Sequence, residues 1–298
     1  MIKNIKTKTF AFCFAMACIA ITQKSSAQDF DTVEIKTIKI TETIYMLQGS
    51  GGNIGVLVGN DGVVLIDDQY APLSEKIKKA LKVLTSKQVR FIINTHFHTD
   101  HTGGNENFGG EGAIIVSQEN SRLRMTTDQF MSALNNEQKG APYDALPKVT
   151  FTESVTLHLN GETVEVFHVS NAHTDGDAII HFKKSNVFHG GDVFVRYGLP
   201  FIDQAHGGTI DGMIKGMDTL LSLTNEDSKI IPGHGMLAEK KDLAEYKKML
   251  ETVRNRISEK ISQGETLKEI IDGDSVKEYN PGVGKDIFIK SVYDSLKK

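Results

Sequence analysis

Alternating and continuous apolar runs dominate the first third of the chain and predict β-strands there. Turn-forming segments rich in glycine and asparagine, 49–53 and 60–62, separate these runs. The predicted strands are 33–40, 43–48, 54–58 and 63–67. Apolar side chains then recur at spacings of three and four over 73–84, and Pro72 suits the first position of that helix. A fully apolar strand, 91–93, follows and leads directly into a group of histidines.

The rest of the chain repeats the order of strands, helix, strand and helix. A strand is expected at 113–116 and a helix over about 119–136, before a loop rich in glycine and proline at 140–147. Further strands are predicted for 155–159, 163–169, 178–182, 186–189 and 229–231, and helices for 210–223 and 240–262. No short repeat and no proline- or serine-rich linker divides the sequence. The pattern therefore predicts an α/β fold, one domain of two sheets with helices outside.

The first 27 residues have the composition of a secretory signal. Lys3, Lys6 and Lys8 precede an uncharged run at 10–21, and the small residues at 25–27 suit a cleavage site. The uncharged run is shorter than the roughly 20 apolar residues needed to cross a bilayer. We therefore expect residues 1–27 to be removed on export, which leaves a single periplasmic or secreted domain, 28–298. The alternative is a buried N-terminal helix.

Composition narrows the classes of function. Removal of residues 1–27 takes away four lysines and no acid, so the formal net charge changes from −4 to −8. An acidic protein is not expected to bind nucleic acid. Both cysteines, Cys13 and Cys18, leave with this segment, so the mature chain has no disulfide, thiol nucleophile or thiolate ligand. Lipidation of Cys18 stays open, but the apolar run continues past it and no stable membrane anchor is expected.

A dense group of metal-ligand residue types follows the apolar strand 91–93. His96, His98, Asp100 and His101 lie within six consecutive positions. Alternate residues of an extended segment point the same way, so His96 and His98 can converge on one point while Asp100 and His101 turn toward an adjacent one. Imidazole nitrogen and carboxylate oxygen are the ligands that zinc prefers when no thiolate is present.

Three further candidate ligands lie downstream, at strand ends or in glycine-containing turns. They are His173, Asp192 after two glycines, and His234 in the string PGHG. Loops at strand ends commonly carry function, and a glycine beside a ligand lets the backbone approach a metal closely.

The string HFHTDH at 96–101, together with the three downstream residues, resembles the metallo-β-lactamase superfamily, and the order of these motifs spans nearly the whole mature chain. The resemblance implies an αββα sandwich, two mixed sheets packed face to face with helices on both outer sides. It also implies two metal ions per chain, zinc or alternatively iron. The ligands it implies are His96, His98 and His173 for one metal, Asp100, His101 and His234 for the second, and Asp192 as the bridge between them.

The resemblance further implies a zinc-dependent hydrolase in which a metal-bridging hydroxide attacks a carbonyl. The substrate would be a small ester, lactone, thioester or lactam. Asp100 would act as the catalytic residue that orients the hydroxide, in addition to binding metal. Asp67, at the end of strand 63–67, matches the family's aspartate that holds a ligand imidazole in its binding tautomer.

Two departures leave other activities open. Specialised β-lactamases of the commonest exported group carry cysteine in place of Asp192, and usually lysine in place of Val195. In having aspartate at position 192, the chain instead resembles glyoxalase II and exported hydrolases of the family. Arg196 could still anchor a substrate carboxylate, and His206 stands where the family lines its pocket, so both are candidate substrate contacts. The alternatives are therefore β-lactam hydrolysis, a mononuclear iron oxygenase or redox enzyme, and a non-catalytic metal-binding module.

Overall fold

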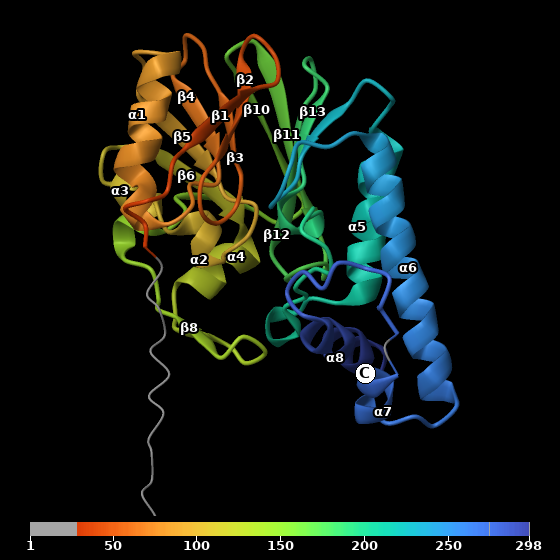
Figure 1. Ribbon diagram of the computed structural model, residues 1–298. Helices are drawn as coiled ribbons and strands as arrows, with labels where there is room; N and C mark the ends of the chain where they lie inside the picture. Colours follow the sequence, from red (N-terminus) through yellow and green to blue (C-terminus); the bar gives the residue numbers. More distant parts are fainter. Residues whose placement is uncertain (1–28, 274, 298) are drawn as a thin grey trace, which may run out of the picture.

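Two β-sheets pack face to face in the computed structural model, which describes residues 29–273 and 275–297 (Figure 1). The first sheet has the strand order β1-β2-β3-β4-β5-β6-β9 and the second the order β10-β11-β12-β13-β14. The strands of the first sheet are β1 (Lys36–Lys39), β2 (Ile44–Gln48), β3 (Ile54–Leu57), β4 (Val63–Ile66), β5 (Val89–Ile93), β6 (Ile114–Gln118) and β9 (Val149–Phe151). Those of the second are β10 (Ser154–Leu159), β11 (Glu162–Val169), β12 (Asp177–Phe182), β13 (Val187–His189) and β14 (Lys229–Ile231). The predicted signal segment, 1–27, lies outside the described residues.

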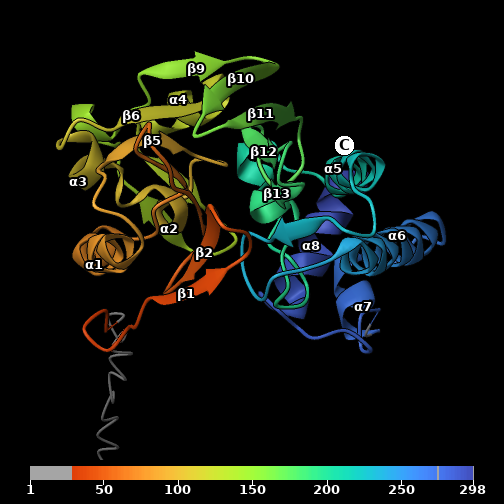
Figure 2. The same cartoon turned by 90° about the horizontal axis from the view of Figure 1, so that it is seen from above.

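Helices cover the outer face of each sheet, as the view from above shows (Figure 2). Helices α1 and α3 lie against the first sheet, and α5, α6 and α8 lie against the second. The helices are α1 (Ser74–Leu84), α2 (Thr99–Thr102), α3 (Asn105–Gly109), α4 (Glu119–Met125), α5 (Ile210–Leu223), α6 (Lys240–Ser262), α7 (Leu267–Asp272) and α8 (Lys285–Leu296). This arrangement confirms the predicted αββα fold class. Within 29–273 and 275–297, no helix has the length and apolar character needed to cross a membrane.

Three apolar layers hold the sandwich together. The middle layer lies between the sheets and includes Ile93 from the first sheet and Val166 and Ile180 from the second. One outer layer joins α1 to the first sheet through Ile77 and Leu81, and the other joins α5, α6 and α8 to the second sheet. Burial of each such side chain stabilises the fold by about 1.5–3 kcal/mol, so the sheets form a firm support for the loops at their edges.

Loops from both sheets meet at one edge of the sandwich. Strands β4, β5, β6 and β9 run parallel to one another, and β13 runs parallel to β14. Parallel strands end at the same edge, so the segments that leave β5, β13 and β14 lie together. These segments are 94–102, 190–195 and 232–235, and they contain most of the candidate ligands.

The helix predicted over 119–136 is wrong in length. Helix α4 ends at Met125, and the chain then forms a separate hairpin of β7 (Gln129–Met131) and β8 (Asn136–Gln138). Two β-branched threonines follow the helix, and the Gln129 side chain donates to the Arg124 carbonyl at 2.8 Å, which takes up a helix-terminal acceptor. The hairpin is described below because of where it lies.

The chain after residue 262 forms helices that the apolar pattern did not predict. Thr266 and Glu269 form a capping box that starts α7, in which each side chain accepts from the other residue's backbone N–H. Helix α8 buries Phe288, Ile289 and Val292 in the layer behind the second sheet. This short segment therefore owes its helical structure to packing against α6 more than to its own sequence.

Candidate metal centre

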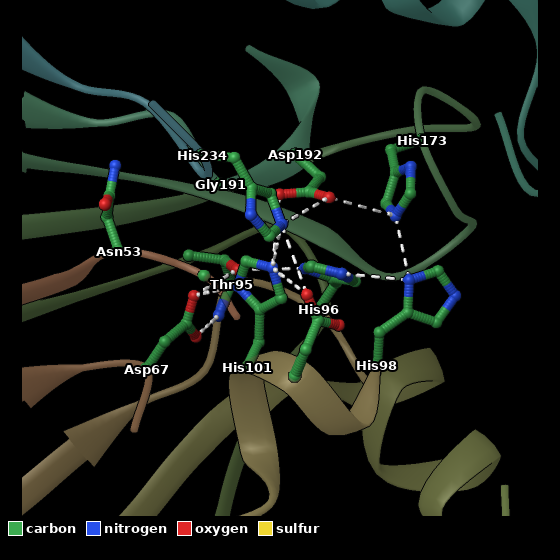
Figure 3. A network of polar contacts seen from close by, with 12 residues as sticks. Asn53, Asp67, Thr95, His96, His98, His101, His173, Gly191, Asp192 and His234 are labelled. Carbon is green, nitrogen blue, oxygen red and sulfur yellow. Dashed lines mark hydrogen bonds and ion pairs between the residues drawn. The ribbon is translucent and has the colours of Figure 1, made fainter. Parts of the chain in front are cut away.

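Three histidines bring ring nitrogens together on one side of the site (Figure 3). Nε2 of His96 lies 3.1 Å from Nδ1 of His98, which lies 2.9 Å from Nε2 of His173. His96 and His98 follow β5 of the first sheet, whereas His173 precedes β12 of the second. All three side chains are buried. We call these three residues the first donor group.

A second donor group, Asp100, His101 and His234, lies beside the first. Nε2 of His101 lies 3.2 Å from Nε2 of His234, and Oδ2 of Asp100 is 3.2 Å from the same His234 nitrogen. Asp100 and His101 lie on the short helix α2, and His234 follows β14. Each donor group thus takes residues from both sheets.

Asp192 faces both donor groups. Its Oδ1 is 3.2 Å from Nε2 of His101, and its Oδ2 is 3.5 Å from Nε2 of His234 and 3.8 Å from Nε2 of His173. The carboxylate needs a glycine next to it, since a Cβ at Gly233 would lie 2.0 Å from Asp192 Oδ1. The place of Asp192 is the one that the sequence analysis gave to a bridging ligand.

Asp67 fixes the orientation of His101, as the sequence resemblance implied. Its carboxylate accepts from the Thr95 backbone N–H at 2.8 Å, from the Thr95 hydroxyl at 2.7 Å and from His101 Nδ1 at 2.7 Å. Asp67 has a positive φ of 64°, a left-handed conformation that turns the chain out of β4. Because Nδ1 of His101 donates to Asp67, Nε2 is the ring nitrogen that faces the second group.

The first donor group has its own hydrogen-bond partners, which sequence reasoning missed. His98 donates from Nε2 to Oδ2 of Asp203 at 2.9 Å, and His206 donates from Nδ1 to the same oxygen at 2.6 Å. His173 donates from Nδ1 to the carbonyl of Phe201 at 2.9 Å. A carboxylate three positions before a histidine, Asp203 before His206, was the available signal for part of this network.

The arrangement fits bound cations. The outer ring nitrogens of His98 and His173 donate to acceptors, and His96 Nδ1 lies 3.0 Å from a Thr95 hydroxyl whose own proton goes to Asp67. The three inner nitrogens therefore point lone pairs at one another across 2.9–3.1 Å, an arrangement that is repulsive unless a cation lies between them. In addition, the buried Oδ1 of Asp192 accepts no hydrogen bond. Three imidazoles, and two imidazoles with carboxylates, are ligand sets that suit zinc.

Burial and charge set the protonation of the two groups differently. Burial lowers the pKa of His96 well below its usual value and that of His173 to about 4, so both rings are neutral at pH 7. Burial also disfavours the charged form of His234, but the Asp192 and Asp100 carboxylates raise its pKa to about 9. Despite burial, the Asp192, Asp100 and Asp67 carboxylates also raise the pKa of His101. His96 and His173 are therefore ready to bind a metal at neutral pH, whereas the second group holds protons that a metal must displace.

The two candidate substrate contacts lie outside the cavity at the site. The Arg196 guanidinium donates to Asp242 Oδ1 at 3.0 Å and to the Leu237 carbonyl at 2.8 Å, which directs it toward the start of α6. His206 is buried and lies behind His98, where it binds Asp203. The geometry thus gives Arg196 a structural ion pair and His206 a positioning role, and neither prediction of a substrate contact is supported.

A cavity of about 440 Å³ opens onto both donor groups. His98, Asp100, His173, Asp192 and His234 line its polar side. The rest of its lining is uncharged, and among the described residues no lysine or arginine contributes to it. Residues of both donor groups therefore border a space large enough for a small organic molecule.

Comparisons with proteins of known sequence give short matches. A segment of 69 residues is 33% identical to the alkyl/aryl-sulfatase BDS1 of Saccharomyces cerevisiae. A segment of 63 residues is 35% identical to the coenzyme F420H(2) oxidase of Methanothermobacter marburgensis. They cover 22% and 20% of this chain, and the chain spans only 11% and 16% of the length of those relatives.

Comparisons with solved structures show the same fold over most of the chain. A metallo-β-lactamase from Pontibacter korlensis is 19% identical with a TM-score of 0.60, and the match covers 73% of this chain and 99% of that one. The sec-alkylsulfatase Pisa1 from Pseudomonas sp. is 14% identical with a TM-score of 0.67, and the match covers 87% of this chain and 50% of that one. The family model described as the metallo-beta-lactamase superfamily matches residues 47–234, which is more than half of the sequence. The chain therefore belongs to the metallo-β-lactamase superfamily.

Proposed function

We propose that the protein is a hydrolase of small carbonyl substrates that binds two zinc ions per chain. The observation that carries this proposal is the position of Asp192. Its carboxylate lies 3.2 Å from His101 and 3.5 Å from His234 in the second donor group, lies 3.8 Å from His173 in the first, and lines the cavity that both groups share. When bound, a pair of divalent cations lowers the pKa of water and polarises a carbonyl oxygen. The first 27 residues support export, and we propose that the enzyme acts outside the cytoplasm.

The residues of the chain hold and orient the reacting groups. Asp100 is 25% exposed at the side chain, more than the 8% of Asp192, so it is the carboxylate more open to the cavity. Burial opposes its ionisation, but His101 and His234 hold its pKa at about 2, and it stays a carboxylate at neutral pH. Asp100 is therefore suited to accept a hydrogen bond from attacking water and fix its direction.

Tyr197 supplies a neutral hydrogen-bond donor to the same cavity. Burial raises the pKa of this phenol above its usual value, so it stays protonated. Its oxygen already accepts from the Phe201 backbone N–H at 3.3 Å, which leaves the hydroxyl proton free for a substrate oxygen. Together the two residues offer one acceptor for water and one donor for a carbonyl.

Hydrolysis of sulfate esters is the second candidate. It is favoured by the sequence match to an alkyl/aryl-sulfatase and by the fold shared with an alkylsulfatase over 87% of this chain. The absence of lysine and arginine from the described lining of the cavity favours a carbonyl substrate over a sulfate, and equally over a β-lactam whose carboxylate needs a cation. A short sequence match to an oxidase supports the iron-dependent redox alternative.

Metal analysis and a parallel substrate screen test the proposal. The zinc and iron contents of the chain as purified are measured, and the chain is then reconstituted with zinc. Turnover is then compared for an aryl ester, a lactone, a thioester, a chromogenic cephalosporin and an aryl sulfate. We expect zinc to bind in a ratio of two per chain, ester or lactone hydrolysis to exceed the other activities, and a chelator to abolish it.

Variants of Asp100 and of a matched surface acid separate catalysis from general damage. Asp100→Asn is expected to lower kcat at least about a hundred-fold, because the amide cannot orient water as the carboxylate does. Asp218→Asn changes the same charge on the exposed face of α5 and should leave kcat unaltered. Full activity in the chelated protein, or iron with oxygen consumption in place of zinc, would contradict the proposal.

A further inference from the structure

Part of the wall of the cavity is apolar. Its lining includes Met131 and Leu134 from the β7–β8 hairpin, Phe201 from the segment after β13, and Val283 from the turn before α8. These residues come from three parts of the chain that are far apart in sequence. Their convergence on one cavity creates an apolar region that the metal chemistry itself does not require.

The hairpin 129–138 is attached to the metal-binding segment and extends over the cavity. The Gln138 side chain donates to the Phe97 carbonyl at 2.8 Å and accepts from the Thr99 N–H at 3.0 Å, and both of these residues neighbour His98. Figure 1 shows the hairpin reaching from the half of the molecule that holds the first sheet toward α8. Its base is thereby fixed relative to the ligands, and its tip stands beside the space that a substrate enters.

The two faces of the hairpin differ in a way that makes them separable by experiment. Leu134 lines the cavity although its residue is 40% exposed, which is unfavourable in water. Phe130 is 54% exposed on the same hairpin and does not line the cavity. The pair offers one apolar residue that lines the cavity and one that does not.

Nearby cations are engaged elsewhere. Arg196 is paired with Asp242, and Lys139 at the base of the hairpin is paired with Asp128 and Glu137. Lys290, which lines a neighbouring pocket with the hairpin residues Ser132 and Ala133, is paired with Asp294. Among the described residues that line the cavity beyond the ligands, the polar groups are neutral: Tyr70, Thr99, Asn136, Gln138 and Tyr197. A negatively charged group placed at the hairpin end of the cavity would lose its hydration and gain no side-chain counter-charge.

We propose that the substrate carries an uncharged, apolar acyl or alkyl arm that lies under the hairpin against Met131, Leu134 and Val283. The inference rests on the proposed carbonyl hydrolysis and adds the substrate class: neutral esters or lactones with an aliphatic arm, as opposed to those that end in a carboxylate. Each methylene that the wall takes out of water improves kcat/KM up to about four-fold.

Matched aryl esters test the arm directly on the full chain reconstituted with zinc. p-Nitrophenyl hexanoate and mono-p-nitrophenyl adipate have acyl chains of the same carbon number and differ in the terminal carboxylate, and p-nitrophenyl acetate lacks the arm. We expect kcat/KM for the hexanoate to exceed that for the acetate and for the adipate at least about ten-fold each, given the burial of several methylenes. Equal values for all three esters would overturn the inference and leave the hydrolase proposal standing.

Hairpin variants locate the arm. Leu134→Lys should lower the hexanoate-to-adipate preference at least about ten-fold, because it removes apolar contact and supplies a cation for the carboxylate. Phe130→Lys introduces the same charge on the same hairpin and should leave the preference unchanged. An equal effect of both substitutions would overturn the location under the hairpin.

A binding measurement keeps the inference testable without turnover. Saturation-transfer NMR on the purified chain compares hexanamide with adipamate, its carboxylate-ended counterpart. We expect transfer to hexanamide only, reduced by Leu134→Lys and not by Phe130→Lys. If no ester is cleaved, the hydrolase proposal fails while this experiment still decides on the arm, and absence of transfer to hexanamide would refute it.

Discussion

Substitution of Asp203 by asparagine tests how the first donor group is held. The Asp203 carboxylate is buried and accepts from His98 at 2.9 Å and from His206 at 2.6 Å through one oxygen, Oδ2. Burial disfavours its charge, but the two histidines hold its pKa well below the usual range. In Asp203→Asn the amide is neutral, and its NH2 group cannot accept from either ring. Hydrogen bonds to a charged acceptor contribute about 1.5–3 kcal/mol each.

The expected result is a selective loss of metal affinity. Loss of a carboxylate that orients a ligand imidazole commonly lowers affinity about 10- to 100-fold, equivalent to about 1.4–2.7 kcal/mol. We expect that loss for the metal held by His96, His98 and His173, and little change for the other. The measurement is competition of zinc-loaded protein against a chelator of known affinity, which resolves two release steps. Circular dichroism at the same temperatures establishes that the variant is folded.

Asp242→Asn is the matched control for this experiment. Asp242 pairs with Arg196 at 3.0 Å and accepts from the Glu239 backbone N–H at the start of α6, but it touches no donor group. The Asp242→Asn substitution should lower the free energy of unfolding by about 0.5–2 kcal/mol, as loss of a helix cap does. It should alter neither of the two metal-release steps. A folded Asp203→Asn variant that retains wild-type affinity in both steps would refute the argument that this carboxylate positions His98.

Three further results are expected. Uptake of the second metal should strengthen as pH rises toward 9 and release protons, because nearby carboxylates, despite burial, raise the pKa of His234 to about 9 and also raise that of His101. The first step should depend less on pH, because burial keeps His96 and His173 neutral above pH 6. Calorimetry in buffers of different ionisation enthalpy measures both steps, and equal slopes would contradict the assignment. Gly233→Ala should abolish tight metal binding, because the added Cβ would lie 2.0 Å from Oδ1 of Asp192. Gly110→Ala is the control, since the nearest atom to its added Cβ is at 3.1 Å. Tight binding retained in Gly233→Ala would count against the geometry. Phe288→Ala should lower the free energy of unfolding by about 3–5 kcal/mol, since the ring is fully buried, and urea denaturation measures this loss. A loss under about 1 kcal/mol would mean that α8 is not part of the core.

The sequence was sufficient for the parts of the site that depend on local spacing. Four of the ligand candidates lie within six positions of one another, so a single turn of chain brings them together whatever the rest of the fold does. Alternating and continuous apolar runs likewise predicted the strands of both sheets except β9, because strands bury one or both faces. His173, Asp192 and His234 could be placed only through the family resemblance, since nothing local relates them to residue 96.

Long-range pairing explains what the sequence did not reveal. The roles of Asp203 and Arg196 depend on which side chain each meets across the fold, and the two differ by 105 and 46 positions from their partners His98 and Asp242. The residues of the hairpin also fit the end of an amphipathic pattern, which predicts a helix. The contacts of the hairpin with Phe97 and Thr99 come from outside its own segment. Such contacts are decided by tertiary structure and not by local propensity.

The distribution of ligands over both sheets has a mechanical consequence. Residues 29–273 and 275–297 contain no cysteine, so no covalent bridge can tie the halves of the sandwich within that span. A cation held by His98 and His173 would link segments 75 positions apart, and one held by His101 and His234 would link segments 133 positions apart. Zinc at a hundred times its dissociation constant would then stabilise the native state by about 2.7 kcal/mol. Scarcity of zinc would thus loosen the very seam at which the halves of the sandwich join.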